Sequence, residues 1–224
     1  MKEQILEMEN YASEHNVPII EKKSIAFIMK YIRDNNIKNV LEIGSAIGYS
    51  AILMASSNQE TMVTTIERDE TRYMECLKNV KKCGMDKKIN VVYQDALELN
   101  LSEDLRYDLI FIDAAKGQYT RFFEKYKNFL NPNGAIITDN IKFHGYVGES
   151  NKLDKGNLKS LVEKIEKYIE FLKTNTAFSE AMMRQIRNFG EKAKEWDMRI
   201  KRRENNNLEV PEEFYRTYEY YADH

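Results

Sequence analysis

The feature that most constrains the fold is a regular alternation of apolar and helical segments between residues 39 and 138. Short apolar runs, which predict strands, lie at 39–43, 61–66, 89–93, 107–112 and 135–138. The spacing of apolar residues predicts helices over 48–57, 70–82 and 118–130. Strands that alternate with helices form a mainly parallel sheet covered on both faces, so the sequence predicts a doubly wound α/β fold.

Further helices are expected in the sequence before and after these strands. They are predicted over 2–14, 21–35 and about 151–174. From Ser179 on, the chain is charged and aromatic and has no strand pattern. We expect a helix over about 180–203 there and a short one from about Pro211, which a first helical turn tolerates. The chain therefore divides into a domain over 1–178 and an atypical helical tail over 179–224.

Composition excludes several classes of protein. With 224 residues, 42% hydrophobic and 31% charged, the chain is typical of one globular domain. It has no apolar run near the ~20 residues that span a bilayer, and its acidic N-terminus differs from signal and transit peptides. Cys76 and Cys83 are expected to be reduced thiols of a cytoplasmic protein. The net charge of −2 does not indicate nucleic-acid binding, although acidic residues elsewhere can mask a basic face.

A glycine turn follows the first predicted strand. The stretch NVLEIGSAIGYSA, residues 39–51, holds Gly44 and Gly48, two of only 9 glycines in the chain. A strand, a glycine turn and a helix start form a crevice where the backbone can approach a ligand closely. An ordinary turn between a strand and a helix uses the same residues for packing, and the short motif leaves both interpretations open.

Polar side chains follow every predicted strand. In chain order they are Ser45 and Ser50, which follow Gly44, then Glu67, then Asp95, then Asp113, then Asp139 with Asn140. In a doubly wound sheet, ligands bind at the carboxyl ends of the strands, where these residues lie. An acid after the second strand is best explained as a contact to ribose hydroxyls, which fits Glu67. Asp95 and Asp69 could instead be helix caps, and Lys116 would by default be a solvated loop lysine.

Three oxygen donors suggest a cation site. Asp113, Asp139 and Asn140 end two strands that we expect to be neighbours. Carboxylate and amide oxygens without Cys or His suit Mg²⁺ rather than zinc. An Asp-Asn turn after the fifth strand would explain two of the three without any metal.

Several motifs together resemble one family. The segments VLEIGSAIGYSA, TTIERDE, QDALE, FIDAAKGQY and TDNI follow in the order and spacing of cation-dependent, S-adenosylmethionine-dependent O-methyltransferases. This is the catechol and caffeoyl-CoA methyltransferase type, and the resemblance covers roughly residues 10–175. The segments ENYASEHNVPII and TDNIKFHGYV resemble most the bacterial branch that includes the tRNA 5-hydroxyuridine methyltransferase.

The resemblance implies a role for each site residue. The cofactor S-adenosylmethionine would contact Ile20 and Ser50 with its methionine end, Gly44 at the turn, Glu67 with its ribose, and Asp95 and Ala96 with its adenine. The cation, Mg²⁺ or another divalent ion, would bind Asp113, Asp139 and Asn140, with Asp113 also facing the cofactor. Lys116 matches the lysine next to the reacting hydroxyl, where it would act as a base or as an electrostatic partner.

The chain departs from that family in its tail. The family closes its sheet with an antiparallel hairpin after the last long helix, whereas the residues from Ser179 on show no such pattern. That hairpin helps to shape the acceptor pocket and the dimer contact, so the tail bears on the acceptor and on the expected homodimer. Basic and aromatic residues of the tail could contact RNA, but a structural helix or a dimer contact is the more common use.

Three functional hypotheses follow. The first is Mg²⁺-dependent methylation of 5-hydroxyuridine at the wobble position of tRNA. The second is methylation of a small catechol or phenol, and the third is a cofactor-binding protein inactivated by its altered tail. A nicotinamide-dependent oxidoreductase is not favoured, because the loop from Gly44 to Gly48 lacks the three-glycine dinucleotide pattern.

Overall fold

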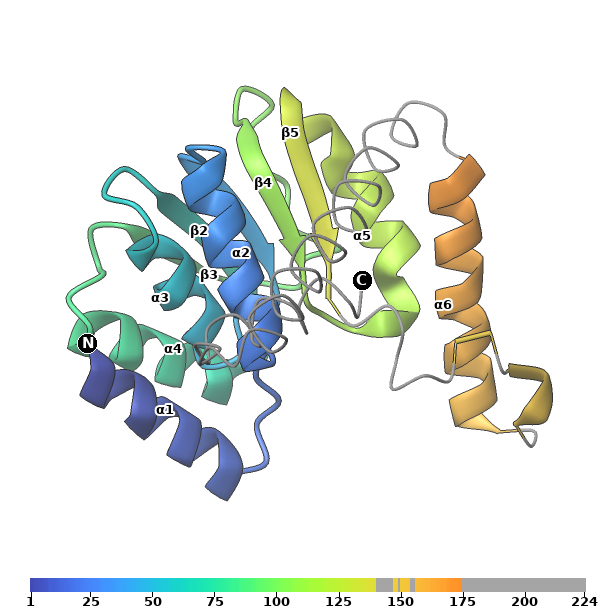
Figure 1. Ribbon diagram of the computed structural model, residues 1–224, viewed down its shortest axis with the longest axis horizontal. Helices are drawn as coiled ribbons and strands as arrows, with labels where there is room; N and C mark the ends of the chain where they lie inside the picture. Colours follow the sequence, from blue (N-terminus) through green and yellow to red (C-terminus); the bar gives the residue numbers. More distant parts are fainter. Residues whose placement is uncertain (140–146, 149, 154–155, 175–224) are drawn as a thin grey trace, which may run out of the picture. The chain divides into compact units, whose positions relative to one another are not determined.

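The computed structural model describes residues 1–139, 147–148, 150–153 and 156–174 (Figure 1). Asn140 and the tail over 179–224, with the helices expected in it, lie outside the described residues. Within the described part of the chain, no helix is both long and apolar enough to cross a bilayer.

A parallel five-stranded sheet forms the centre of the fold. Its strands run in the order β3-β2-β1-β4-β5. They are β1 (Asn39–Ile43), β2 (Met62–Glu67), β3 (Ile89–Tyr93), β4 (Tyr107–Ile112) and β5 (Leu130–Thr138). Strands β2 and β3 lie on one side of β1, and β4 and β5 lie on its other side. The strand order thus reverses between β1 and β4, and a crevice for ligands forms at their carboxyl ends.

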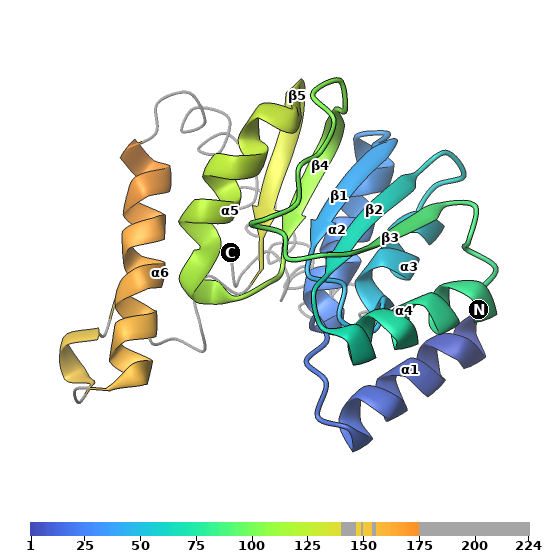
Figure 2. The same cartoon turned by 180° about the vertical axis from the view of Figure 1, so that it is seen from behind.

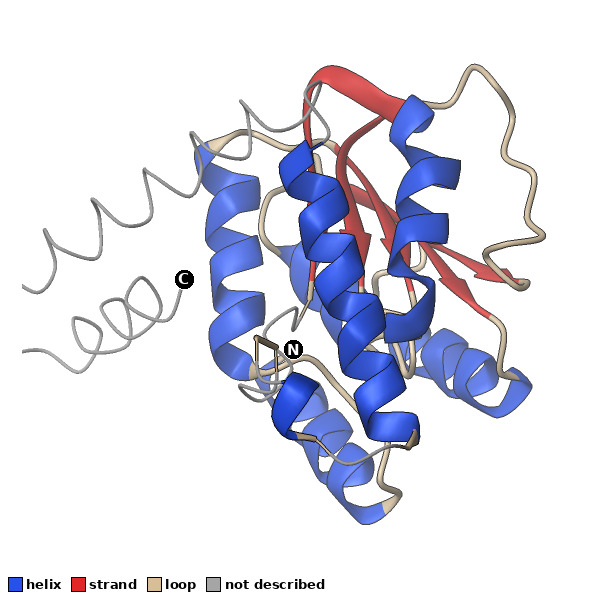
Figure 3. Cartoon of the chain, turned by 90° about the vertical axis from the view of Figure 1, so that its right-hand side faces the viewer, coloured by secondary structure: helices blue, strands red, loops and turns tan. Residues whose placement is uncertain are grey.

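Six α-helices accompany this sheet in the described part of the chain. They are α1 (Lys2–Glu14), α2 (Lys22–Asp34), α3 (Tyr49–Ser56), α4 (Glu70–Lys82), α5 (Tyr119–Tyr126) and α6 (Asn157–Thr174). Helices α2 and α3 lie over one face in Figure 1, and α5 lies over the opposite face in Figure 2. Seen from the side, the strands form one layer with helices packed against it (Figure 3).

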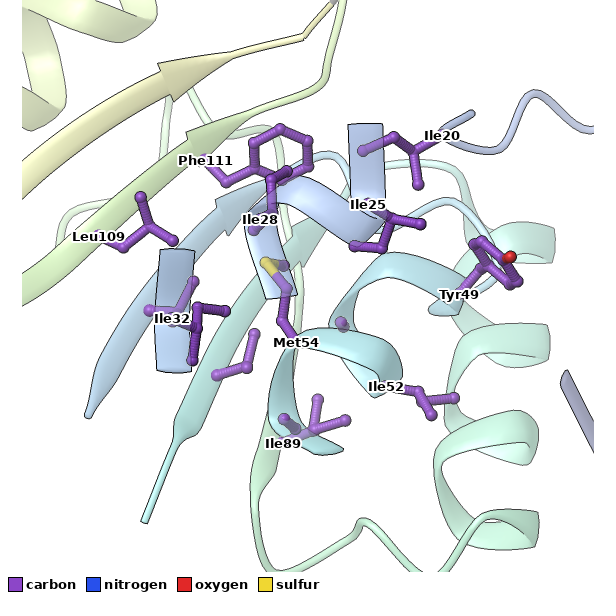
Figure 4. Close-up of a cluster of buried hydrophobic side chains, with 14 of the residues drawn as sticks. Ile20, Ile25, Ile28, Ile32, Tyr49, Ile52, Met54, Ile89, Leu109 and Phe111 are labelled. Carbon is purple, nitrogen blue, oxygen red and sulfur yellow. The ribbon is translucent and has the colours of Figure 1, made fainter. Parts of the chain in front are cut away.

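Alternation along the strands explains this layering. Leu109 and Phe111 of β4 belong to the core cluster that also holds Ile28 and Ile32 of α2 and Met54 of α3 (Figure 4). The residue between them, Ile110, is equally buried but points to the other face. A strand buried on both faces must be apolar at every position, which is why the sheet could be predicted from the sequence.

Most predicted elements match the observed ones within one or two residues, but three boundaries were wrong. The helix expected over 118–130 consists of α5 followed by a 3₁₀ turn (Lys127–Phe129), and the turn expected at residues 131–134 belongs to β5. The Asn131 side chain donates a hydrogen bond to Asp108 Oδ1 at 2.7 Å, which holds this stretch against β4.

The last helix also begins later than expected, at Asn157 rather than near 151. Residues 150–152 form a 3₁₀ turn instead. The Glu166 side chain accepts hydrogen bonds from the Gly148 N–H and the Ser150 hydroxyl, so the preceding segment folds back onto α6. Cys76 and Cys83 are free thiols, as expected.

Candidate active site

One cavity of about 670 Å³ opens at the carboxyl ends of the strands. Its wall holds every described residue to which the sequence assigned a role, namely Ile20, Gly44, Ser50, Glu67, Asp95, Ala96, Asp113, Lys116 and Asp139. Its position is the strand-order reversal between β1 and β4, where ligands bind in folds of this kind. The structure therefore brings the predicted site residues together, while their individual roles remain predictions.

A smaller hollow of about 470 Å³ lies at the opposite end of the sheet. Its carboxylate, Asp108, accepts hydrogen bonds from the N–H groups of Lys38 and Asn39 and from the Asn131 side chain. These bonds join the starts of neighbouring strands, which gives Asp108 a structural role.

The glycine turn is built for close backbone approach. Gly44 has a φ of +103°, and a Cβ there would lie 2.2 Å from the carbonyl oxygen of Asp113. Gly48 has a φ of +85° at the N-cap of α3, and a Cβ there would lie 2.7 Å from Cys76 Sγ. Both positions thus require glycine for packing. Gly44 also lines the cavity, so the packing and ligand-binding interpretations of this turn are compatible.

Glu67 is fixed in the cavity wall at the end of β2. Its Oε2 accepts a hydrogen bond from the Ala46 N–H at 2.8 Å, and its Oε1 accepts from the N–H groups of Arg68 and Asp69, each at 2.9 Å. The side chain is buried. Three backbone donors therefore hold this carboxylate in one orientation at the point where a ribose contact was predicted.

The end of β3 continues the same wall. Asp95 Oδ1 accepts a hydrogen bond from the Leu97 N–H at 2.8 Å, and this bond, helped by Arg68, lowers the Asp95 pKa. The Tyr126 hydroxyl donates to the Ala96 carbonyl at 2.6 Å. Asp69 is the N-cap of α4, as the alternative interpretation proposed for it.

Glu42, which the sequence analysis overlooked, lies beneath the cavity. It is fully buried in the middle of β1, and its Oε2 accepts a hydrogen bond from the Thr65 hydroxyl. Burial raises the pKa of Glu42 to about 7, against the effect of the Ser50 and Thr65 hydroxyls. A charged residue inside the apolar run VLEI was the signal that could have identified it.

Two carboxylates meet at the ends of β4 and β5. The paired strands bring Asp113 and Asp139 side by side, and burial together with the Asp139 charge raises the pKa of Asp113 to about 7. Lys116 opposes that rise. Two neighbouring carboxylates repel each other, and a divalent cation between them would offset this repulsion, because carboxylate oxygens are ligands that such cations prefer. Among the described residues no third His, Cys, Asp or Glu joins them, and the predicted third donor, Asn140, lies outside that part of the chain.

Lys116 is not the solvated loop lysine that is the default expectation. It is half-buried in a 3₁₀ turn (Lys116–Gln118), and its Nζ lies 3.3 Å from the Tyr119 hydroxyl. That hydroxyl donates a hydrogen bond to the Asp139 carbonyl at 3.0 Å. Tyr119 thus links the lysine to the strand end that carries the second carboxylate.

The chain matches known methyltransferases. A family model described as O-methyltransferase matches residues 3–181. A candidate caffeoyl-CoA O-methyltransferase of Arabidopsis thaliana is 33% identical over 141 residues, which cover 61% of this chain and 60% of that protein.

Solved structures agree with this match. A candidate caffeoyl-CoA O-methyltransferase from Staphylococcus aureus is 38% identical, with a TM-score of 0.73 over 77% of this chain and 83% of that one. An O-methyltransferase from Bacillus cereus, solved in complex with S-adenosylhomocysteine, shares the fold at 23% identity, with a TM-score of 0.67 over 77% and 80% of the two chains. Because the family model spans most of its length, the chain belongs to the O-methyltransferase family.

Proposed function

We propose that this chain transfers the methyl group of S-adenosylmethionine to an acceptor hydroxyl with the help of a divalent cation, Mg²⁺ being the first choice. The observation that carries the proposal is the cavity in which Gly44, Glu67, Asp113 and Asp139 meet. One side of this cavity carries Gly44 and Glu67, which suit a nucleoside, and the other carries the two carboxylates, which repel each other. Membership of the O-methyltransferase family supports methyl transfer as the reaction.

The cofactor would lie along the carboxyl ends of the strands. Its methionine end would face Ile20 and Ser50, and its ribose would face Glu67, which three N–H groups hold in place. Its adenine would lie against Asp95 and Ala96. This placement points the sulfonium toward the ends of β4 and β5, where the acceptor would bind.

The reaction mainly requires the protein to align the acceptor oxygen with the methyl carbon and the sulfur of the cofactor. A sulfonium methyl is already activated, so an oxygen–carbon bond forms as the carbon–sulfur bond breaks, leaving S-adenosylhomocysteine. A hydroxyl with a pKa of about 10 is a poor nucleophile while it keeps its proton. Lys116 would stabilise the oxyanion or, when neutral, accept that proton. A bound divalent cation would supply Lewis acidity that lowers the acceptor's pKa, with Asp113 and Asp139 as its ligands.

For the acceptor we propose 5-hydroxyuridine at the wobble position of tRNA, which rests on the sequence resemblance within the bacterial branch. A small catechol is the second candidate, because the relatives in Arabidopsis and Staphylococcus bear the name of caffeoyl-CoA O-methyltransferase. In both acceptors a second oxygen neighbours the reacting hydroxyl, so both acceptors would offer the oxygen ligands that Mg²⁺ prefers.

The test is transfer of labelled methyl groups to both acceptors side by side, with Mg²⁺ and with EDTA. Label in tRNA that carries 5-hydroxyuridine, absent from tRNA that lacks it, would support the first acceptor. Label in catechol alone would select the second. Binding of S-adenosylhomocysteine without transfer to either acceptor would contradict the proposal and favour a non-catalytic protein.

A further inference from the structure

We propose that Glu9 is a positioning residue that sets the affinity for the methionine end of the cofactor. It does so by fastening the strap, which we define as residues 16–21 between α1 and α2, to the start of α3. The inference rests on the proposed function only through its cofactor, and it is independent of the acceptor and of the cation.

The Glu9 carboxylate joins three elements that are distant in sequence. Its Oε1 accepts a hydrogen bond from the Tyr49 hydroxyl at 2.8 Å, and its Oε2 accepts from Lys22 Nζ at 2.7 Å. Glu9 belongs to α1, Lys22 begins α2, and Tyr49 begins α3. One side chain on the first helix therefore connects the far end of the strap with the helix that follows the glycine turn.

Both partners of Glu9 adjoin the cavity. Tyr49 is buried, lines the cavity and directly precedes Ser50, to which we assign, with Ile20, the methionine end of the cofactor. Lys22 directly follows the strap, whose residues Pro18 to Glu21 form part of the cavity wall. Figure 4 shows Tyr49 at the start of α3 on the same side of the cluster as Ile20 and Ile25.

The strap is held at its near end by its own backbone. The Val17 N–H donates a hydrogen bond to the Ala12 carbonyl, which ties the start of the strap to α1. At its far end the Glu9–Lys22 contact provides the corresponding tie. The Glu9 side chain is 18% exposed and that of Lys22 is 76% exposed, so the bond from the buried Tyr49 is screened less by solvent and salt than the bond from Lys22.

The same helix offers a matched control. Glu7 also lies on α1 and pairs with Lys82 of α4, but its own side chain is exposed and this ion pair joins neither the strap nor α3 to α1. Glu7→Gln and Glu9→Gln remove the same charge from the same helix. Only Glu9→Gln removes a contact with residues next to the cavity.

The experiment measures the dissociation constant of S-adenosylhomocysteine by calorimetry for the full chain and for Glu9→Gln, Glu7→Gln and Tyr49→Phe, without acceptor. We expect an increase of about tenfold for Glu9→Gln, as the loss of a charge-assisted contact predicts. Tyr49→Phe should weaken binding in the same direction, and Glu7→Gln should not. In turnover, Glu9→Gln should raise the KM for S-adenosylmethionine and leave kcat at saturation largely intact.

Two results would overturn this role of Glu9. One is equal affinity of Glu9→Gln and the unchanged chain, and the other is an equal loss for Glu7→Gln, which would indicate a general effect of α1. If Glu9→Gln does not fold, Tyr49→Phe alone decides, because it removes only the hydroxyl that meets Glu9. Failure of the unchanged chain to bind S-adenosylhomocysteine would instead contradict the proposed cofactor.

Discussion

Replacing Gly44 with alanine should damage the fold and the cofactor site together. The new Cβ would lie 2.2 Å from the Asp113 carbonyl oxygen and 2.9 Å from its carbon, whereas real Cβ atoms keep contacts above 3.0 Å. The ends of β1 and β4 would therefore have to separate by roughly 0.8 Å. In addition, a φ of +103° is unfavourable for an L-residue.

Gly84→Ala is the matched control for this change. Gly84 also has a positive φ, +65°, but a Cβ there would meet nothing within 4 Å. We expect Gly84→Ala to cost about 1 kcal/mol of unfolding free energy, the cost of left-handed backbone for alanine. Gly44→Ala should cost about 2 kcal/mol more, because overpacking adds to that strain.

Urea unfolding of both variants measures the difference between their unfolding free energies. Calorimetry with S-adenosylhomocysteine measures the effect of each variant on cofactor affinity. Gly44→Ala should lose cofactor affinity, since Asp113 and the turn move apart, and Gly84→Ala should keep it. Equal destabilisation of the two variants to within about 0.5 kcal/mol would refute the close approach of Gly44 to Asp113.

Three further outcomes are expected. Asp139→Asn should lower methyl transfer by about 100-fold and leave S-adenosylhomocysteine affinity nearly unchanged; a parallel loss of affinity would argue against a separate cation site. Because the folded-state pKa of Glu42 is about 7 against 4.5 for the exposed group, unfolding free energy should fall as pH rises through that window. Glu42→Gln should reduce this fall in urea titrations at several pH values, while Asp113, whose pKa is also raised to about 7, still contributes to it; identical pH profiles would contradict this prediction. Tyr119→Phe should lower kcat and leave cofactor affinity unchanged, because the hydroxyl bonds to Lys116 Nζ and to the Asp139 carbonyl; unchanged kcat would contradict this role.

The sheet and the grouping of the site could be predicted because they depend on local patterns. A parallel strand buried on both faces is apolar at every position, and the residue after it lies at the edge where ligands bind. Glu67, Asp113 and Asp139 could therefore be placed at one edge from their positions alone. The family motifs added roles that spacing by itself does not supply.

The features that the sequence did not reveal depend on contacts between distant segments. The start of β5 looks like a turn locally, but Asp108 of β4 binds Asn131 and keeps it beside the sheet. Glu9 is an ordinary surface glutamate in its own helix, and its role depends on Tyr49, 40 residues away. Glu42 was visible as a charge in an apolar strand, yet its surroundings depend on Ser50 and Thr65, which come later in the chain.

The most direct test of the central claim is methyl transfer from labelled S-adenosylmethionine as a function of Mg²⁺ after treatment with EDTA. The acceptors are tRNA that carries 5-hydroxyuridine and, in parallel, catechol. We predict no transfer in EDTA, recovery as Mg²⁺ is added, and no recovery at the same Mg²⁺ concentrations for Asp139→Asn. Full transfer in EDTA, or recovery of Asp139→Asn at the same Mg²⁺ concentrations as the unchanged chain, would contradict a cation held by Asp113 and Asp139.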